Sequence, residues 1–208
     1  MNRIAVCTLL IGIICAVPAT ASAVQVLPVN LEELVEKAGL IFEGTCMSVD
    51  SRPDEQGIIA TYTTFNVHQT WKGEVSTTIT IKTYGGRYGS LKMTVPGMPA
   101  FKPGEQVFLF LHPTSEIGFT SPIGMGQGRF KIFINPDGGK KLVNDDNNRH
   151  LFRNLDWEHM EGSADRNSIS QLRMSREPSA GPVGYDVLKH LVEVLLQRSG
   201  GRIGRSLP

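Results

Sequence analysis

Residue types able to perform catalysis or hold a metal ion are few in this 208-residue chain. Cys46, one of three cysteines, lies in a strand-like run with Phe42 and Gly44. A nucleophilic thiolate needs a cationic neighbour or a helix terminus to lower its pKa, and no such neighbour stands beside Cys46 in the sequence. We therefore predict a buried structural thiol.

The histidines show no metal-binding pattern. They stand at positions 68, 112, 150, 159 and 190, with no H-E-x-x-H pair and no cysteine or histidine spacing typical of zinc. His68 and His112 would meet only if the strands that carry them were neighbours. We predict no catalytic residues, no metal and no cofactor. An enzyme with carboxylates or these two histidines gathered from separate strands is kept as an alternative.

Two further motifs resemble ligand-binding loops only superficially. Residues 145–148 read Asp-Asp-Asn-Asn, but they lack the alternating spacing and final glutamate of a calcium loop, so a solvated turn is expected. The glycines at 85, 86 and 89 and at 124, 126 and 128 connect or precede strand-like segments, whereas a phosphate-binding loop opens a helix. We expect these glycines to be bends of a curved sheet.

The best candidate for a binding surface is an aromatic, glycine-rich loop. Tyr84, Arg87 and Tyr88 share this loop, and Met98 and Phe101 lie in or near the next turns. Exposed aromatic and methionine side chains on loops are typical contacts for a protein or glycan. These five residues are the candidate binding surface. Packing of the loop on the end of the barrel is the other interpretation, and it is the one that we favour.

The elements that must position these residues are mostly strands. Period-two alternation and turn chemistry predict seven or eight short strands; the main segments are 40–49, 58–71, 77–83, 91–95, 106–112, 117–120, 128–134 and 140–143. Residues 52–57 should join the first two in a long hairpin, and residues 135–139 should form another hairpin turn. Residues 31–38 predict a short helix with Asn30 as N-cap, Glu33 at the capping-box position and Gly39 as a left-handed C-cap.

The N-terminus has the pattern of a secretory signal peptide. Arg3 precedes an apolar run over residues 4–17, and a small-residue site ends at Ala23, after which we predict cleavage. The run is too short to span a bilayer. A lipid anchor on Cys15 is the alternative, but the bulky Ile14 precedes that cysteine. The chain is therefore expected to be exported, to the periplasm or the exterior.

The composition argues against two classes of protein, nucleic-acid binders and proteins with a transmembrane helix. Removal of residues 1–23 leaves 20 basic and 20 acidic residues, which argues against a nucleic-acid binder that neutralises phosphates. No later run of 18 apolar residues predicts a transmembrane helix. We divide the chain into a signal peptide (1–23), a β-barrel domain (24–155), a polar linker (156–182), an amphipathic C-terminal helix (183–198) with Asp186 as its cap, and a disordered tail (199–208).

Four motifs carry a family resemblance: L-x-x-x-A-G-L-I-F-E-G at 34–44, V-x-x-x-W-K-G at 67–73, F-x-P-G-E-x-V-x-L-F-L at 101–111 and G-x-G-x-F at 126–130. The chain resembles a group of uncharacterised secreted bacterial proteins. Residues 30–135 are similar in plan to the netrin-like domain, the OB-type barrel of tissue inhibitors of metalloproteinases. Those inhibitors bind the protease zinc through an N-terminal cysteine, whereas this mature chain would begin at Val24, so their zinc-binding mechanism does not carry over.

The sequence therefore predicts a mainly β fold, an OB-like or netrin-like antiparallel barrel with a short N-terminal helix and a C-terminal helix. The leading functional hypothesis is a secreted or periplasmic, non-enzymatic protein-binding module whose partner is another protein. The first alternative is an extracellular metalloprotease inhibitor, whose partner would be a secreted protease. The second is the enzyme with a site assembled from separate strands.

Overall fold

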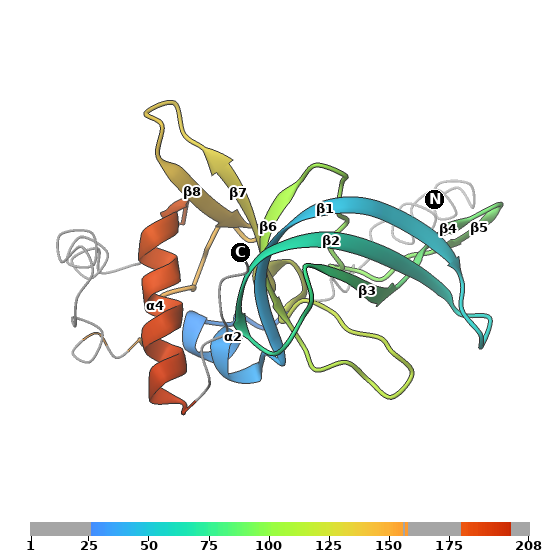
Figure 1. Ribbon diagram of the computed structural model, residues 1–208, viewed down its shortest axis with the longest axis horizontal. Helices are drawn as coiled ribbons and strands as arrows, with labels where there is room; N and C mark the ends of the chain where they lie inside the picture. The colour runs from blue at the N-terminus through green and yellow to red at the C-terminus, as the bar shows by residue number, and fades with distance from the viewer. Residues whose placement is uncertain (1–25, 156, 158–179, 201–208) are drawn as a thin grey trace, which may run out of the picture.

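The computed structural model describes residues 26–155, 157 and 180–200. Its main feature is a seven-stranded antiparallel sheet in the order β3-β2-β1-β6-β7-β8-β9 (Figure 1). In chain order the elements are α2 (Leu31–Lys37), β1 (Leu40–Pro53), β2 (Ile59–Lys72), β3 (Thr78–Tyr84), β4 (Gly86–Tyr88), β5 (Leu91–Met93), β6 (Gln106–Leu111), the 3-10 helix η1 (Met125–Gly128), β7 (Arg129–Ile134), β8 (Lys140–Asn144), β9 (Val183–Gly184) and α4 (Tyr185–Arg198). The prediction of a mainly β fold is confirmed.

The predicted hairpin of β1 and β2 is confirmed and forms the long arch seen in Figure 1. The pairing of β1 with β2 shifts register at three points between residues 41 and 48. Because bulges of this kind bend a strand and increase its twist, the hairpin curves strongly. Asp54 holds the connecting turn by accepting hydrogen bonds from the backbone N–H groups of Gln56 (3.0 Å) and Ile58 (2.8 Å).

The antiparallel sheet is confirmed, but it does not close into the barrel that the sequence predicted. Residues 117–120 were expected to form a strand, but this segment makes only an isolated parallel bridge between Phe119 and Lys82 of β3. A second isolated bridge joins Leu111 of β6 to Pro122. Two bridges connect the edges of β3 and β6 without a continuous ladder, so the curved half of the sheet stays open.

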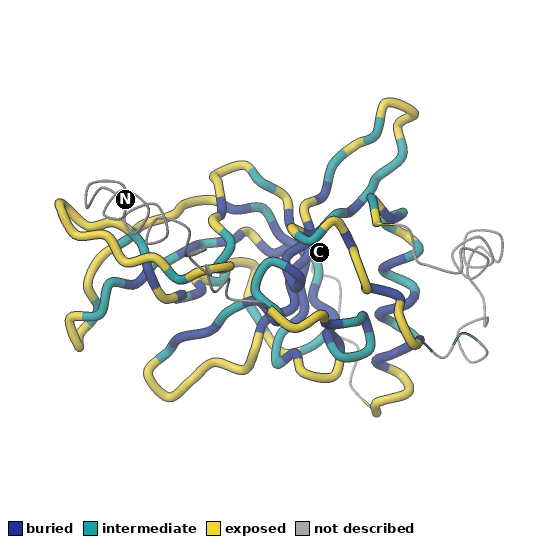
Figure 2. Tube along the Cα trace, turned by 180° about the vertical axis from the view of Figure 1, so that it is seen from behind, coloured by how far each residue is buried: buried dark blue, intermediate teal, exposed yellow. Residues whose placement is uncertain are grey.

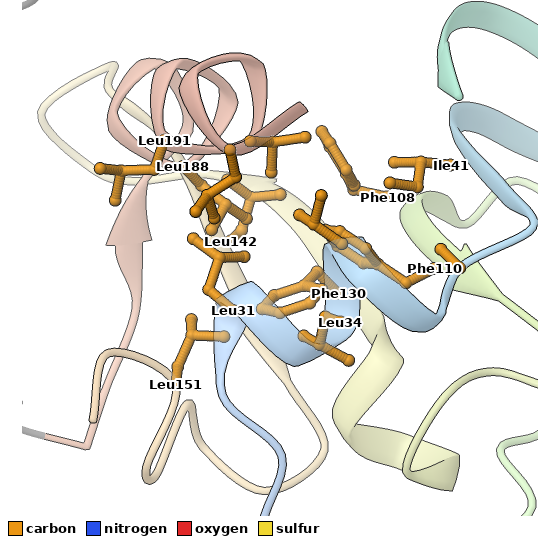
Figure 3. Packing of buried hydrophobic residues seen from close by; sticks show 14 of the residues in the cluster. Leu31, Leu34, Ile41, Phe108, Phe110, Phe130, Leu142, Leu151, Leu188 and Leu191 are labelled. Carbon is orange, nitrogen blue, oxygen red and sulfur yellow. The ribbon is translucent and has the colours of Figure 1, made fainter. Parts of the chain in front are cut away.

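The sheet carries two hydrophobic cores. The smaller core lies in the curved half and includes Phe42, Phe65 and Phe101. The larger core lies between the other half of the sheet and both helices (Figure 3). Among its aromatic residues, Trp71 stacks on Phe108, with ring centroids 4.4 Å apart. In the view of Figure 2 the buried trace is concentrated around the middle of the molecule.

Helix α2 forms as predicted at its start but not at its end. The capping box is present, since Asn30 Oδ1 accepts from the Glu33 N–H (2.9 Å) and Glu33 accepts from the Asn30 N–H (3.1 Å). Gly39 is not a left-handed cap; the C-cap is Ala38 in an extended conformation. Gly39 is instead required by close packing, because a Cβ there would lie 2.8 Å from the Cα of Pro113.

Helix α4 is docked on its own domain. It begins at Tyr185 with Gly184 as N-cap, so the expected cap at Asp186 is wrong. Its buried residues Leu188, Leu191 and Leu195 belong to the larger core together with α2, as Figure 3 shows for Leu188 and Leu191 beside Leu142 of β8. Of the helices in the described ranges, none has the length and apolar character to cross a membrane. The predicted signal peptide and most of the predicted linker and tail lie outside the described residues.

Candidate functional site

A groove of about 280 Å³ lies between the end of the β1–β2 arch and the β4–β5 hairpin. We call it the hairpin groove. Its lining comes from five strands and the segment that follows them: Val49, Ser51, Thr61, Thr83, Tyr84, Gly85, Gly86, Arg87, Lys92, Met93, Thr94, Val95, Met98, Pro99, Ala100 and Phe101. Figure 1 shows the β4–β5 hairpin projecting from one end of the sheet, and Figure 2 shows exposed residues along that end.

The structure brings four of the five sequence-predicted site residues together in this groove. Tyr84, Arg87, Met98 and Phe101 all line it. Phe101 is buried, with 7% of its surface exposed, and its ring packs edge-on against Phe65 with centroids 5.2 Å apart. It therefore anchors the loop to the core rather than forming an exposed contact. Tyr88 does not line the groove; it lies at the exposed tip of the β4–β5 hairpin.

Gly86 sets the position of the hairpin against the arch. Its φ is +133°, and a Cβ at this position would lie 2.4 Å from Ser51 Oγ and 2.6 Å from Thr61 Oγ1. Those two hydroxyls are 2.9 Å apart, and Thr61 also donates to the carbonyl oxygen of Gly85 (2.7 Å). Only glycine allows the backbone this close approach and this φ. The predicted glycine bend is thus also the floor of the groove.

A second hollow of about 290 Å³ continues from the hairpin groove across Tyr84 and Met98. Tyr84 stacks on Phe119 with ring centroids 3.8 Å apart and an interplanar angle of 7°, and the Lys82 ammonium lies 4.0 Å from the centre of the Phe119 ring. Met125 also lines this hollow, with a left-handed φ of +56° that is uncommon for a residue with a side chain. These contacts make the wall beside Tyr84 apolar and firmly supported.

Sequence reasoning missed Lys92 as a site residue. It stands directly opposite Arg87 across the β4–β5 hairpin and lines the same groove. The signal was the Gly89-Ser90 pair between two short segments, since glycine-containing two-residue connections are typical of tight hairpins. Recognising that hairpin would have placed Lys92 beside Arg87.

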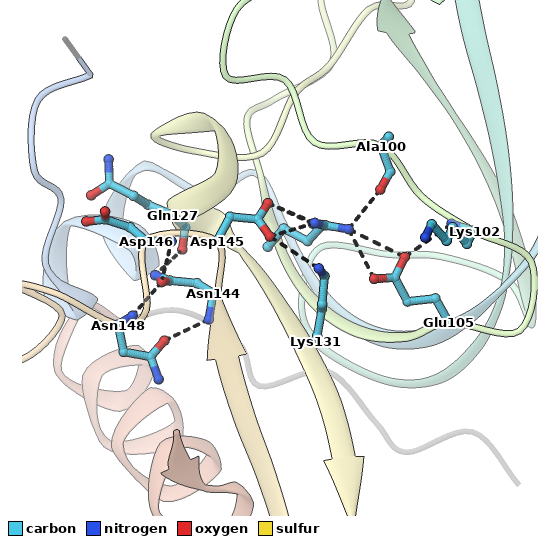
Figure 4. A network of polar contacts seen from close by, with 10 residues as sticks. Ala100, Lys102, Glu105, Gln127, Lys131, Asn144, Asp145, Asp146 and Asn148 are labelled. Atoms are coloured by element: carbon cyan, nitrogen blue, oxygen red, sulfur yellow. Dashed lines mark hydrogen bonds and ion pairs between the residues drawn. The ribbon is translucent and has the colours of Figure 1, made fainter. Parts of the chain in front are cut away.

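Arg129, at the start of β7, holds the far end of the groove in place. Figure 4 labels three of its contact residues, Ala100, Glu105 and Asp145. The Arg129 side chain is 5% exposed and makes a two-pronged ion pair with Asp145, with Nη2 to Oδ1 at 2.6 Å. It also donates to the carbonyl oxygen of Ala100 (2.9 Å) and to Glu105 (3.1 Å). The planar guanidinium suits such simultaneous contacts. One buried cation therefore fixes the segment that leads into Phe101.

The turn after β8 is only in part the solvated turn that the sequence predicted, because Asp145 and Asn147 are exposed but two asparagines are buried. Asn148 is 1% exposed and Asn144 is 5% exposed. The amide oxygen of each asparagine accepts from the backbone N–H of the other, at 2.7 and 2.8 Å. The Asn144 amide also donates to the carbonyl oxygen of Gln127 (3.0 Å). Buried polar groups need such partners. The turn is therefore a buried hydrogen-bond network that joins β8 to η1 (Figure 4).

A third hollow, of about 430 Å³, has an ionisable lining that includes Asp145, Asp146, Arg149 and His150. Both of its carboxylates already have cationic partners: Asp145 pairs with Arg129, and Asp146 pairs with Arg149 at 2.6 Å. Within the described residues no group of three or more His, Cys, Asp or Glu side chains is arranged to hold a metal ion.

The remaining candidates for chemistry are dispersed. His68 lies on β2 and His112 follows β6, and β1 runs between these two strands. The two strands are therefore not neighbours, so the sheet does not bring the two histidines together. The prediction for Cys46 is confirmed: the residue is 1% exposed, and burial, with a smaller contribution from Glu105, raises the pKa of its thiol.

Comparison of the chain with models of known protein families, with curated protein sequences and with solved structures finds no match. The site must be interpreted from its own geometry.

Proposed function

We propose that this protein is an exported, non-enzymatic binding module that holds a segment of another protein in the hairpin groove. The observation that carries the proposal is the grouping of exposed apolar side chains at this end of the molecule. Among the described residues, five of the ten large apolar side chains that are exposed lie on or beside the groove: Val49, Tyr84, Tyr88, Leu91 and Met93. Export is supported by the signal-like pattern of residues 1–23.

The chemistry of this surface supports binding of a polypeptide. Tyrosine and methionine are enriched at protein interfaces, where tyrosine gives large contact area at low entropic cost and methionine adapts to different shapes. Tyr88 and Leu91 are cross-strand partners at the hairpin tip, 51% and 58% exposed. An exposed pair of this kind extends the apolar surface beyond the groove, which suits an elongated partner.

The surrounding fold supports a site that exists before binding. Phe101 is anchored in the core, Arg129 fixes Ala100, and Gly86 fits against Ser51 and Thr61. Pre-organised sites lose less conformational entropy on binding. The sheet therefore serves as a scaffold for the hairpin and its neighbouring loop.

We also propose that the curved half of the sheet is related to OB-type barrels. The four antiparallel strands β1, β2, β3 and β6, with isolated bridges that join residue 119 to β3 and residue 122 to β6, support a relationship to the partly open five-stranded OB barrel. Such barrels commonly bind ligands on their strands and connecting loops. The position of the hairpin groove at the end of this curved half agrees with that use.

The test is selection of peptides from a library of random twelve-residue sequences displayed on phage. We expect the protein to enrich a family of peptides whose binding is lost on changing Tyr84, Tyr88, Leu91 and Met93 to alanine. The matched control changes Leu27, Met47 and Ile134 to alanine, because these side chains are also exposed and apolar but lie outside the groove.

The control variant should keep the affinity of the wild-type protein for the selected peptides. Circular dichroism and urea unfolding would verify that both variants fold. Failure to enrich any peptide family, or equal loss of binding in both variants, would contradict the proposed function.

A further inference from the structure

The cations at the mouth of the hairpin groove indicate the chemistry of the partner. Arg87 on β4 and Lys92 on β5 are directly paired across the hairpin. Side chains at directly opposed positions of an antiparallel pair lie on the same face, and both of these line the groove. Two positive charges therefore stand side by side on the hairpin face opposite to that of the Gly86–Met93 pair, and they border the groove from there.

This arrangement is unfavourable in the free protein. Like charges directly opposite each other destabilise an antiparallel pair. In the part of the chain that the structure describes, neither Arg87 nor Lys92 has an acidic partner within ion-pair distance. The residues that line the groove include no aspartate or glutamate. An anionic group from outside the chain would relieve this repulsion.

The polar groups deeper in the groove are already satisfied. Ser51 and Thr61 bond to each other, Thr61 bonds to Gly85, and Thr83 donates to the carbonyl oxygen of Thr61 (3.4 Å). What the groove offers to a ligand is therefore a cationic edge beside an apolar surface of Tyr84, Met93 and Met98.

We infer that the segment bound in the hairpin groove is an acidic peptide in which a carboxylate adjoins an aromatic or aliphatic side chain. The carboxylate lies between Arg87 and Lys92, and the apolar side chain lies against Met98, which lines the groove from the segment after the hairpin. This inference rests on the proposed function, and it adds the charge and the composition of the partner. A peptide is favoured over a lipid because the exposed Tyr88 and Leu91 continue the surface along the hairpin, beyond the groove.

The probe is the same phage-displayed library, selected on the wild-type protein and on Arg87→Glu/Lys92→Glu. The wild-type protein should enrich sequences with aspartate or glutamate next to an apolar residue. The double variant should instead enrich sequences with lysine or arginine, because its groove edge has the opposite charge. The matched control, Lys141→Glu/Arg153→Glu, makes the same change in net charge on β8 and on the segment after it, and it should select the wild-type sequences.

The affinities of individual selected peptides complete the test. For a glutamate-bearing peptide we expect the Kd to rise about tenfold in Arg87→Glu/Lys92→Glu at low salt, and the difference to shrink in 0.5 M salt. Replacing the glutamate by glutamine should remove most of the difference between the two proteins. Because both substituted side chains are exposed on a hairpin, the variant should fold as the wild-type protein does.

The outcomes separate this inference from the proposal beneath it. Peptides enriched by the groove without acidic residues, and bound equally by the charge-reversed variant, would overturn the inference and leave the binding module standing. An absence of enriched peptides would overturn both. A third outcome is binding to vesicles of anionic phospholipid that depends on Arg87 and Lys92, without selection of acidic peptides. This result would contradict the inference that a peptide supplies the anionic group.

Discussion

Tyr185, the first residue of α4, donates its hydroxyl hydrogen to the buried carboxylate of Glu43 in β1. The other carboxylate oxygen of Glu43 accepts from Lys140 of β8 at 2.9 Å, and the Lys140 ammonium lies 3.9 Å from the centre of the Tyr185 ring. Further along α4, Glu193 accepts from the indole N–H of Trp71 at 3.3 Å. Polar contacts at two points of α4 therefore fix the orientation of this helix on the apolar core.

We predict that Tyr185→Phe lowers the free energy of unfolding by about 1.5–3 kcal/mol at pH 7, because it leaves a buried charged acceptor short of one hydrogen bond. Burial and the adjacent Glu43 raise the pKa of Tyr185. A raised pKa means that the contribution to stability is complete below the ordinary tyrosine pKa of about 10 and is lost as the pH rises above it. Urea unfolding at pH 7 and pH 11 should therefore show a smaller effect of Tyr185→Phe at the higher pH.

Tyr62→Phe is the control for this measurement, since Tyr62 lies against Arg52 on the surface of the hairpin and has no carboxylate partner in the described residues. It should change stability little at either pH. An effect of Tyr185→Phe that is equally large at pH 7 and pH 11 would contradict the assigned role.

The turn between β1 and β2 should be sensitive to acid. The side chain of Asp54 is 2% exposed and pairs with Lys82 of β3 at 2.9 Å. The Lys82 partner and the backbone N–H donors of Ile58 and Gln56 lower the pKa of Asp54. For a lowered pKa, the stabilisation is present above the ordinary carboxyl pKa of about 3.9 and is lost as the pH falls through the folded-state value.

A double-mutant cycle with Asp54→Asn and Lys82→Met measures this effect. The coupling free energy from urea unfolding should be favourable at pH 7 and should decline towards zero in strong acid. The cycle cancels the separate loss of the Lys82 contact with Phe119. A coupling that does not change between pH 7 and strong acid would show that the Asp54 charge is not the source.

Gly86→Ala should disturb both stability and binding. The new Cβ would meet Ser51 Oγ at 2.4 Å in a backbone conformation at φ +133°, so we expect a loss of about 1–3 kcal/mol in unfolding free energy. Peptides that the wild-type groove selects should bind at least tenfold more weakly, because the hairpin must move away from the arch.

Gly89→Ala provides the comparison within the same hairpin. Gly89 has φ +58°, but nothing lies within 4 Å of a Cβ at this position. Its cost should be limited to the left-handed backbone penalty of about 1–2 kcal/mol, and peptide affinity should stay near that of the wild-type protein. Equal effects of the two variants on affinity would argue against the close contact at Gly86.

Local patterns were sufficient to predict the elements whose contacts are near in sequence. The β1–β2 hairpin follows from period-two patterns, clearest in β2, on both sides of a turn that Asp54 holds, and the start of α2 follows from Asn30 and Glu33 alone. The Gly-rich aromatic loop indicated four of the sixteen residues that line the hairpin groove, because these four are close together in the sequence, whereas the lining residues of β1 and β2 are distant from them.

Features that depend on distant partners could not be predicted in the same way. Whether Phe119 completes a barrel depends on the reach of residues 113–123 between β6 and β3, and only isolated bridges form. The asparagines of the turn after β8 look solvent-exposed in the sequence, yet Gly181 and Gln127 approach and bury them. Arg129 finds its carboxylates at Glu105 and Asp145, which nothing in its own strand pattern indicates.

Arg129 should be the most sensitive charged residue of the scaffold. Arg129→Met removes the cationic partner that Glu105 has among the described residues and the two-pronged partner of Asp145, and it leaves the Ala100 carbonyl oxygen without its donor. Loss of one member of a buried ion pair typically costs 3–5 kcal/mol; because Asp145 is partly exposed, we expect about 3 kcal/mol in urea unfolding. The segment before Phe101 should also loosen, so the affinity for selected peptides should fall under conditions where the variant is still folded.

Arg149→Met is the matched control, since its pair with Asp146 is largely exposed and should contribute less than about 1 kcal/mol. If both variants lost similar stability, or if Arg129→Met kept full peptide affinity, Arg129 would not be the residue that holds the far end of the groove in position.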